Sequence, residues 1–531
     1  MLWIALHLPL LSLESFAATL PPAASSQPLA LMDAHTLLAV NAPARALGVQ
    51  AGIKRATALA LAPQLTLGLA DPVRDAQALT AVAHAALAFT PTVVIQPPSD
   101  AGSSNTPDDT PHTVLLEVQA SLRYFGGLAA LQQRLQHALA PLGHRLHIVS
   151  ASTPLGAALL ARVNQKLACA DLVATQRALA RAPVWLLGPG RIHWEALQGM
   201  GLRTIDDLRR VPRDGVARRF GPVVLDELDR ATGKRPDPRE PLTLPPAFDS
   251  RLELFARADT TEQLMHGAAV LLARLVVWLC AQHAFVRRFT LVMAHEKRSR
   301  QDTPGSGVTQ LEVALAEPSR DSAHLLVLLR DRLTQLQLPA PTLDLRLHAD
   351  DIARRAPPNT ELFPTPAAEH EGLTRLIERL QARLGREQVQ RLVVVQDHRP
   401  ERATASRTAD AQMRPACARR PTKAAGGKPG ESDVSGANGA ARLVRPVWLF
   451  QQPEPLHERE AAGARGPWVG GQPLQLLSGP ERIESGWWDF DAVERDYYIA
   501  QLPGGALVWV YRERVPKDGA RLNWFLQGRF G

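Results

Sequence analysis

The sequence RLELFARADTTEQLMHGAAVLLARLVVWLCAQHAFVRRFTLVM (residues 251–293) sets out a strand, a helix and a second strand. Leucine and charged residues alternate at 252–254, and apolar residues alternate again at 289–293, as in strands with one buried face. Between them, residues 261–282 carry leucines at the three-to-four spacing of one helix face: Leu264, Leu271, Leu275 and Leu279. The stretch therefore predicts the order β-α-β.

The residues that follow repeat this order. Apolar residues alternate at 311–315 and at 343–347, and the helix expected between them carries Leu325, Leu329, Leu333 and Leu336. Residues 248–350 thus predict the order β-α-β-β-α-β, which is the split βαβ or ferredoxin-like arrangement. Many unrelated proteins use this fold, so it does not by itself indicate a function.

Strands and helices are mixed upstream of this unit, and the composition changes downstream. Residues 1–165 show both periodicities, whereas 183–240 have a helical pattern interrupted by Gly and Pro. Residues 403–442 contain almost no large apolar side chain, which predicts a disordered linker. The alternation in ALVWVYRER (506–514) predicts a small β-rich domain after it. The predicted fold class is therefore α+β with several domains.

Composition and charge limit the range of functions. The three cysteines form no CxxC pair, so neither a disulfide framework nor a zinc site is predicted, which suits a reducing cytoplasm. Residues 402–445 hold nine Lys/Arg and three Asp/Glu, and so account for +6 of the net charge of +8. DNA affinity elsewhere must therefore come from local basic patches. The first twenty residues have no basic residue before their apolar run and are too short to span a bilayer, which favours a buried strand over a signal peptide or membrane segment.

The N-terminal strand carries a family resemblance. Residues 5–14, ALHLPLLSLE, resemble the opening strand of Y-family (translesion) DNA polymerases, whose pattern is D-x-D-x-F-[YF]-A-S-V-E. The two metal-binding aspartates of that pattern correspond to Ala5 and His7. The pattern S-x-D-E-A of a second palm strand resembles VLLEV (114–118), which places Leu116 and Glu117 at the other two carboxylate positions.

This resemblance implies a polymerase scaffold with a degenerate metal site. Two-metal phosphoryl transfer needs acidic oxygens that hold two Mg²⁺ ions about 4 Å apart. Alanine and leucine offer no ligand, imidazole is a poor ligand for Mg²⁺, and Glu117 alone cannot assemble the site. We therefore expect no catalytic residue, no metal, no cofactor and no enzymatic activity. The alternative is an active translesion DNA polymerase with an atypical metal site.

Other segments resemble ImuB-type proteins, the polymerase-like subunits of a bacterial mutagenesis cassette. The longest covers 478–531, and shorter ones lie at 201–212, 218–221, 236–242, 378–385 and 397–403. The resemblance spans nearly the whole chain except the linker. It implies a non-catalytic adaptor in DNA repair, acting in translesion synthesis and mutagenesis during the SOS response to DNA damage. The partners it implies are DNA, the sliding clamp, an error-prone C-family DNA polymerase and a RecA-like accessory protein.

The resemblance also gives expected domain boundaries. The expected order is a palm at 1–165 with fingers inserted at about 21–70, a helical thumb at 166–242, a little finger at 248–350, a clamp-binding peptide with a helix-strand extension at 356–402, the linker at 403–442 and a partner-binding domain at 443–531. The ferredoxin-like unit takes the place of the little finger in this right-hand arrangement.

One candidate DNA contact lies in LQGMGLRTIDDL (197–208). Gly199 and Gly201 are typical of a helix-hairpin-helix element, in which backbone N–H groups beside Arg203 and Thr204 approach a DNA phosphate without reading bases. The alternative is a simple glycine helix cap.

Two charged clusters have a functional and a structural interpretation each. Arg287 and Arg288, which precede the third element of the ferredoxin-like unit, fit contact with a template backbone and fit a solvated strand edge equally well. Asp397, His398 and Glu401 resemble a metal or acid–base cluster, but structural salt bridging is the favoured interpretation.

Two apolar pairs are candidates for protein contacts. Leu362 and Phe363, in a proline-flanked loop, resemble a degenerate clamp-binding peptide, and the alternative is a pair that packs on its own domain. Six of the ten tryptophans lie after residue 443. Most are expected in the core of the β-rich domain, while Trp487 and Trp488 are candidates for a partner surface, where Trp and Arg act as anchors.

Overall fold

The structure of the protein is a computed structural model. It describes residues 1–21, 27–96, 112–188, 193–296, 307–354, 366–409, 445–461, 464–489, 491–515 and 523–530. The chain divides into two compact units, Met1–Arg383 and Leu384–Gly531.

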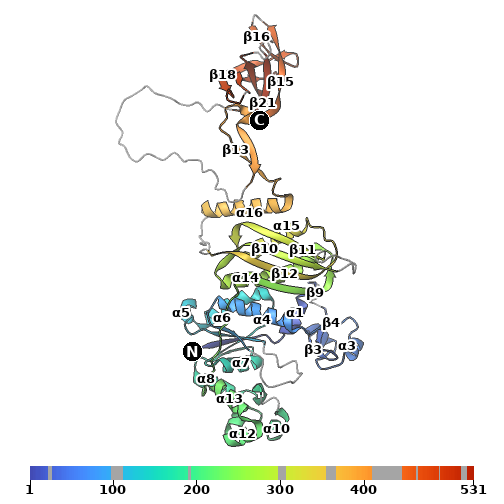
Figure 1. The fold of residues 1–531 in the computed structure, drawn as a ribbon, viewed down its shortest axis with the longest axis vertical. Helices are drawn as coiled ribbons and strands as arrows, with labels where there is room; N and C mark the ends of the chain where they lie inside the picture. The colour runs from blue at the N-terminus through green and yellow to red at the C-terminus, as the bar shows by residue number, and fades with distance from the viewer. Residues whose placement is uncertain are drawn as a thin grey trace, which may run out of the picture. The chain divides into compact units, whose positions relative to one another are not determined.

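A five-stranded sheet forms the centre of the first unit, with the strand order β5-β6-β1-β7-β8. Its strands are β1 (Trp3–His7), β5 (Val93–Ile95), β6 (Thr113–Glu117), β7 (His147–Ala151) and β8 (Lys166–Ala168). One face packs on the helices α4 (Pro72–Leu87) and α6 (Leu128–Leu139), and the other packs on α7 (Pro154–Val163) (Figure 1). Because side chains alternate along a strand, Ile4 enters the first core and Ala5 the second.

A smaller sheet follows the first helix, α1 (Leu11–Ala17). Its elements are β2 (Leu29–Met32), β3 (Leu37–Val40), α2 (Ala42–Ala46), α3 (Arg55–Leu61) and β4 (Thr66–Leu69), with the strand order β3-β2-β4. They enclose a core of their own. Asn41 caps α2, because its Oδ1 accepts hydrogen bonds from the N–H groups of Ala44 and Leu29, each at 3.0 Å. These elements lie within the range expected for the fingers.

The region expected as the thumb is helical in its described part. Its helices are α8 (Leu172–Arg181), α10 (Trp194–Gly199), α11 (Ile205–Arg210), α12 (Arg213–Phe220) and α13 (Pro222–Thr232). They share one core with α7 and with the Ala5 face of the central sheet. Helix α11 begins with a capping box in which the Thr204 hydroxyl accepts from the Asp207 N–H, and the Asp207 carboxylate accepts from the Thr204 N–H.

The β-α-β-β-α-β order predicted for 248–350 is confirmed. Its elements are β9 (Phe248–Ala258), α14 (Thr261–Ala281), β10 (Ala284–His295), β11 (Val308–Ser319), α15 (Ser322–Leu333) and β12 (Thr342–Arg354), with the strand order β11-β10-β12-β9. Helix α14 is long and apolar enough to cross a membrane by length and composition. Its Leu271, Leu275 and Leu279 are fully buried against this sheet and α15, so it is a core helix. Helix α16 (Pro366–Leu384) follows and packs on the same unit through Ala382.

The second unit is β-rich, as predicted. Its seven-stranded sheet has the order β17-β16-β15-β21-β20-β19-β18. The strands are β15 (Trp448–Ala461), β16 (Ala464–Val469), β17 (Gln472–Pro473), β18 (Gln475–Ser485), β19 (Val493–Gln501), β20 (Leu507–Glu513) and β21 (Trp524–Arg529). A hairpin of β13 (Gln390–Val394) and β14 (Thr404–Thr408) belongs to this unit.

The hairpin corrects the expected linker. Residues 404–408 form a strand, so the predicted start of the linker at 403 is too early. Their polar side chains gave no apolar signal, because both faces of this short strand are largely exposed. The two units meet in sequence at 383–384, upstream of the low-complexity segment rather than within it. Residues 410–444 lie outside the described part of the chain.

Candidate functional site

The candidate site lies where β1 ends. His7 pairs with Thr113 on β6 and with His147 on β7, and Nδ1 of His7 lies 2.9 Å from the Thr113 hydroxyl. Two positions earlier on the same face, Ala5 pairs with Leu115 and is fully buried. The two positions at which the resemblance places metal-binding aspartates thus hold a methyl group inside a core and an imidazole at the rim.

The register corrects the expectation for β6. Glu117 pairs with Trp3 at the far end of β1, four positions from His7, which is about 13 Å along a strand. Leu116 pairs with Ile4 and enters the opposite core. The expectation that Leu116 and Glu117 stand beside His7 is therefore wrong. The motif match rested on few identities, whereas the register is set by the buried face of the strand.

A cleft of about 580 Å³ opens at this end of the sheet, between β1 and the smaller sheet. Much of its lining is apolar and comes from the turn after β1, including Leu8, Pro9 and Leu10. Among the described residues that line it, the carboxylates are those of Asp71 and Asp75. Both are engaged, since Asp71 caps α4 by accepting from the Val73 N–H at 2.9 Å. Asp75 accepts from the hydroxyls of Ser12 and Ser15.

Burial keeps the histidines of the cleft neutral. It lowers the pKa of His7 to about 3, with further lowering by His147 and Arg162. Burial also lowers the pKa of His112, which lies one residue before β6 and lines the cleft. A two-Mg²⁺ site needs several hard oxygen donors, and neutral imidazoles with two engaged carboxylates do not fit it. Among the described residues, no cluster of three or more His, Cys, Asp or Glu side chains is placed to hold a metal ion.

The glycines of 197–208 do not present free N–H groups. Helix α10 ends at Gly199, and Gly201 has a φ of +78°. The N–H groups of residues 200–202 donate to carbonyls of residues 196–198. Those of Arg203 and Thr204 donate to the Asp207 carboxylate at 3.2 and 2.9 Å. A phosphate would have to displace that carboxylate, so the alternative of a helix cap describes these groups better.

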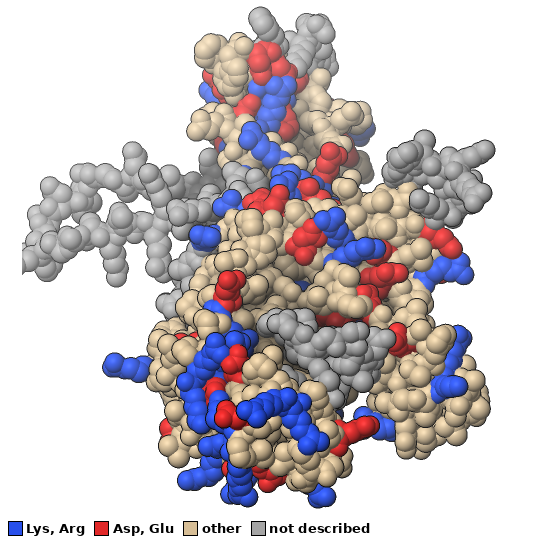
Figure 2. Space-filling view, turned by 60° about the horizontal axis from the view of Figure 1, so that its bottom comes forward, with Lys and Arg blue, Asp and Glu red and all other residues tan. Residues whose placement is uncertain are grey.

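Exposed arginines surround the same helices. Arg203, Arg209, Arg218 and Arg219 are exposed, and none has an ion pair within the described residues. Figure 2 shows Lys and Arg side chains gathered at the lower left of the view, over the helical region expected as the thumb. This patch was not predicted from the sequence, because nearby acidic residues hide it in the composition of 203–219.

The arginines of β10 face carboxylates instead. Arg288 lies 3.8 Å from Glu312 and 3.9 Å from Asp351, and Arg287 lies 4.0 Å from Asp351. Two further pairs lie on the same open face of the sheet, Arg251–Asp344 and Arg346–Asp249. Glu253 pairs with Asp344 across the strands and adds another negative charge. This face is therefore a network of ion pairs and not a basic surface.

Of the two apolar pairs predicted to contact other proteins, the structure describes one. Leu362 and Phe363 lie outside the described residues. Trp487 and Trp488 are 80% and 51% exposed, with ring centroids 5.5 Å apart, in the turn between β18 and β19. Trp509 is buried and stacks on Tyr497, as expected for a core tryptophan.

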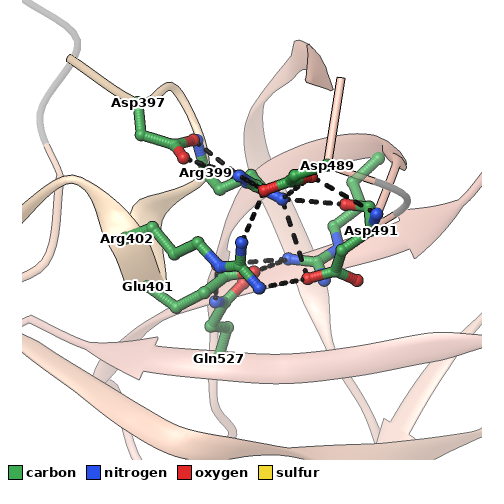
Figure 3. A network of polar contacts seen from close by, with 8 residues as sticks. Asp397, Arg399, Glu401, Arg402, Asp489, Asp491 and Gln527 are labelled. Carbon is green, nitrogen blue, oxygen red and sulfur yellow. Dashed lines mark hydrogen bonds and ion pairs between the residues drawn. The ribbon is translucent and has the colours of Figure 1, made fainter. Parts of the chain in front are cut away.

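A buried arginine supports this turn (Figure 3). Arg399 is 1% exposed and donates to the carboxylates of Asp397 and Asp489 at 2.7 and 2.6 Å. Its guanidinium also donates to the Asp491 carbonyl at 3.0 Å and lies 5.7 Å from the Trp488 ring. Hydrogen bonds from Arg399 lower the pKa of Asp397 to about 2.

The salt bridging predicted for Asp397 and Glu401 is confirmed, since Glu401 also pairs with Arg495 at 3.0 Å. The role of Arg399 was not predicted. Its partner Asp489 is ninety residues away in the chain, and no local pattern signals such a pair.

The chain was compared with known proteins. No family model matches it. It is 28% identical over 503 residues to the protein named Protein ImuB of Caulobacter vibrioides strain NA1000 / CB15N, which covers 91% of this chain and 100% of that protein. The same figures hold for Protein ImuB of strain ATCC 19089 / CIP 103742 / CB 15.

Among solved structures, a ternary complex of Dbh covers 66% of this chain and 99% of its own, with a TM-score of 0.37 and 15% identity. The crystal structure of DinB from Sulfolobus solfataricus covers the same shares, with a TM-score of 0.36 and 16% identity. Because these TM-scores are below 0.5, the fold class rests on the sheets and helices described above. These confirm an α+β chain of several parts, with a ferredoxin-like β-α-β-β-α-β unit and an additional β-rich C-terminal region.

Proposed function

We propose that this chain, a homologue of protein ImuB, is a non-catalytic polymerase-like adaptor in translesion DNA synthesis after DNA damage. The observation that carries the proposal is the end of β1. There His7, Thr113 and His147 meet beside an apolar cleft, and the only carboxylates lining its described part are engaged in hydrogen bonds. Without free acidic oxygens among its described lining residues, the cleft lacks ligands for the metal ions that neutralise the charge developing in phosphoryl transfer.

The adaptor would hold DNA through the thumb. Exposed arginines without ion pairs are the groups that contact phosphates, and they give affinity without sequence preference. Arg203, Arg218 and Arg219 meet this description within the described residues. The ion-paired Arg287 and Arg288 contribute less, because a phosphate would compete with carboxylates already beside them.

The adaptor would also bind proteins in the bacterial cytoplasm. From the ImuB resemblance we infer a sliding clamp, held by Leu362 and Phe363, and recruitment of an error-prone C-family polymerase and a RecA-like protein. Trp487 and Trp488 are the proposed anchors for recruitment, since large exposed aromatic side chains beside arginines are typical of interface hot spots.

A binding experiment tests this function. The full chain should bind primer–template DNA equally well in Mg²⁺ and in EDTA, because no metal bridges protein and phosphate. In the same buffers, the change of Leu362 and Phe363 to Ala should weaken clamp binding and leave DNA binding unchanged. DNA affinity that disappears in EDTA would instead favour the alternative, an active polymerase with an atypical metal site.

A further inference from the structure

Helix α16 buries a polar stripe and exposes its leucines. Thr374, Glu378 and Ala382, four residues apart, are at most 7% exposed and face the ferredoxin-like unit. On the opposite side lies an exposed set that we call the leucine face, which consists of Leu373, Leu376, Leu380 and Leu384. Each of these side chains is 37–55% exposed. A surface helix normally turns its apolar stripe toward the core, so this orientation needs a cause.

The cause is the carboxylate of Glu378. It accepts hydrogen bonds from the N–H groups of Ala316, at 2.5 Å, and Glu317, at 3.3 Å, on β11. It also lies 2.8 Å from Nε2 of His324 on α15. Rotation of α16 that buried the leucines would break the hydrogen bonds that the buried Glu378 carboxylate makes to β11 and α15, and bonds to a buried charged group are costly to lose. The leucine face is therefore held outward.

The spacing of the leucine face fits one helix. The intervals of three, four and four residues between its leucines keep them on one side of the helix, as in an 11-residue repeat, and the face is about 17 Å long. Arg379 and Arg383 lie beside it, exposed and without an ion pair in the described residues. A second copy of α16 packed on the first would bring these arginines toward one another. An occupant with Asp or Glu beside its apolar stripe would pair with them instead.

We propose that α16 docks an amphipathic helix of a partner protein whose apolar stripe is flanked by acidic residues. This docking site goes beyond the adaptor function proposed above, because it depends neither on the palm cleft nor on the tryptophan turn. It gives α16 a protein-binding surface of its own.

Two designed helical peptides test the proposal with the full chain. Both carry leucine at the seam positions, and one has Glu at the flanks while the other has Lys. By fluorescence anisotropy, the Glu peptide should bind at least about tenfold more tightly than the Lys peptide. Changing Leu376 and Leu380 to Ser should weaken its binding by a similar factor. Changing Leu61, an exposed leucine of α3, to Ser is the matched control and should have no effect.

Charge reversal makes the test independent of these leucine changes. With Arg379→Glu and Arg383→Glu, the preference should switch to the Lys peptide. The proposal is overturned if neither peptide binds, if both bind equally, or if binding survives the leucine changes. It is also overturned if ultracentrifugation shows a dimer that the leucine changes dissociate, since the face would then be a self-interface. Binding to phosphatidylserine vesicles without peptide binding would overturn it in favour of a lipid surface.

Discussion

Nδ1 of His7 lies 2.9 Å from the Thr113 hydroxyl, across the strand pair that borders the cleft of the central sheet. Paired carboxylates at such positions repel each other unless a metal ion lies between them. Here two neutral polar groups satisfy each other, so this pair carries no charge that needs a cation. The same burial that removes the charge of His7 makes the sheet sensitive to acid.

The pKa of His7 gives the first prediction. In the unfolded chain His7 binds a proton near pH 6.5, but in the folded chain only near pH 3, so the native state loses stability as the pH falls below 6.5. This residue should remove about 2 kcal/mol from the free energy of unfolding between pH 7 and pH 5. In urea unfolding, the free energy of unfolding of His7→Gln should fall between pH 7 and pH 5 by about 2 kcal/mol less than that of the wild type. His35→Gln, at an exposed histidine, should behave as wild type, and equal drops in all three proteins would refute the assignment.

The thumb arginines give the second prediction. Arg218→Gln with Arg219→Gln should weaken DNA binding and reduce the slope of log affinity against log salt by about 0.9 for each phosphate that the protein no longer neutralises. The matched change of Arg287 and Arg288 to Gln should have a smaller effect, because these side chains already face carboxylates. A larger loss of DNA affinity on changing Arg287 and Arg288 would indicate that DNA binds to the ferredoxin-like unit instead.

The third prediction concerns Arg399. Arg399→Ala leaves Asp397 and Asp489 close together without their shared cation, so the second unit should unfold at a lower temperature. The unfolding temperature of Arg399→Lys should lie between those of Arg399→Ala and the wild type, because Lys keeps the charge but not the planar guanidinium. Arg402→Ala, at a half-exposed position, is the control with a smaller effect. Thermal unfolding followed by tryptophan fluorescence measures all four, and an unchanged transition in Arg399→Ala would contradict the role of this network.

The fourth prediction concerns where the C-terminal domain begins. Because the loop at 397–402 bonds to Asp489 and Asp491, residues 385–409 should stay bound to residues 445–531 and resist further digestion after a protease has cut the predicted linker between them. The fragment 445–531, which lacks the hairpin, should be cleaved faster in limited proteolysis. Equal resistance would show that the hairpin is only an appendage, and that the domain begins at 443 as expected from composition.

The periodicity of apolar residues predicted the order of helices and strands. It did not predict which residues of distant strands lie opposite each other. The leucine spacing of α14 and the alternation of β10 and β12 sufficed for the β-α-β-β-α-β order, because burial of one face repeats with the period of the element. The prediction for the position of Glu117 was wrong for a different reason. A strand register depends on which residues of two distant segments lie opposite each other, and a short motif does not specify this.

Only part of the candidate site could be predicted from the sequence, because residue types are local but contacts between distant segments are not. That positions 5 and 7 carry no carboxylate could be identified from residue types alone. The engagement of the amides at 203–204 by Asp207, and of Asp489 by Arg399, arises only when the chain folds. The exposed leucine face of α16 was also hidden, since a leucine stripe in a sequence is ordinarily expected to face a core.

The central claim is that the cleft beside His7 performs no phosphoryl transfer. Primer extension by the purified full chain, with all four deoxynucleotides and either Mg²⁺ or Mn²⁺, tests this most directly. The predicted result is no incorporation above that of buffer alone, while an active translesion polymerase extends the same primer in parallel. Extension by the wild-type chain that disappears when His7 and His112 are both changed to Ala would place catalysis in this cleft and contradict the claim.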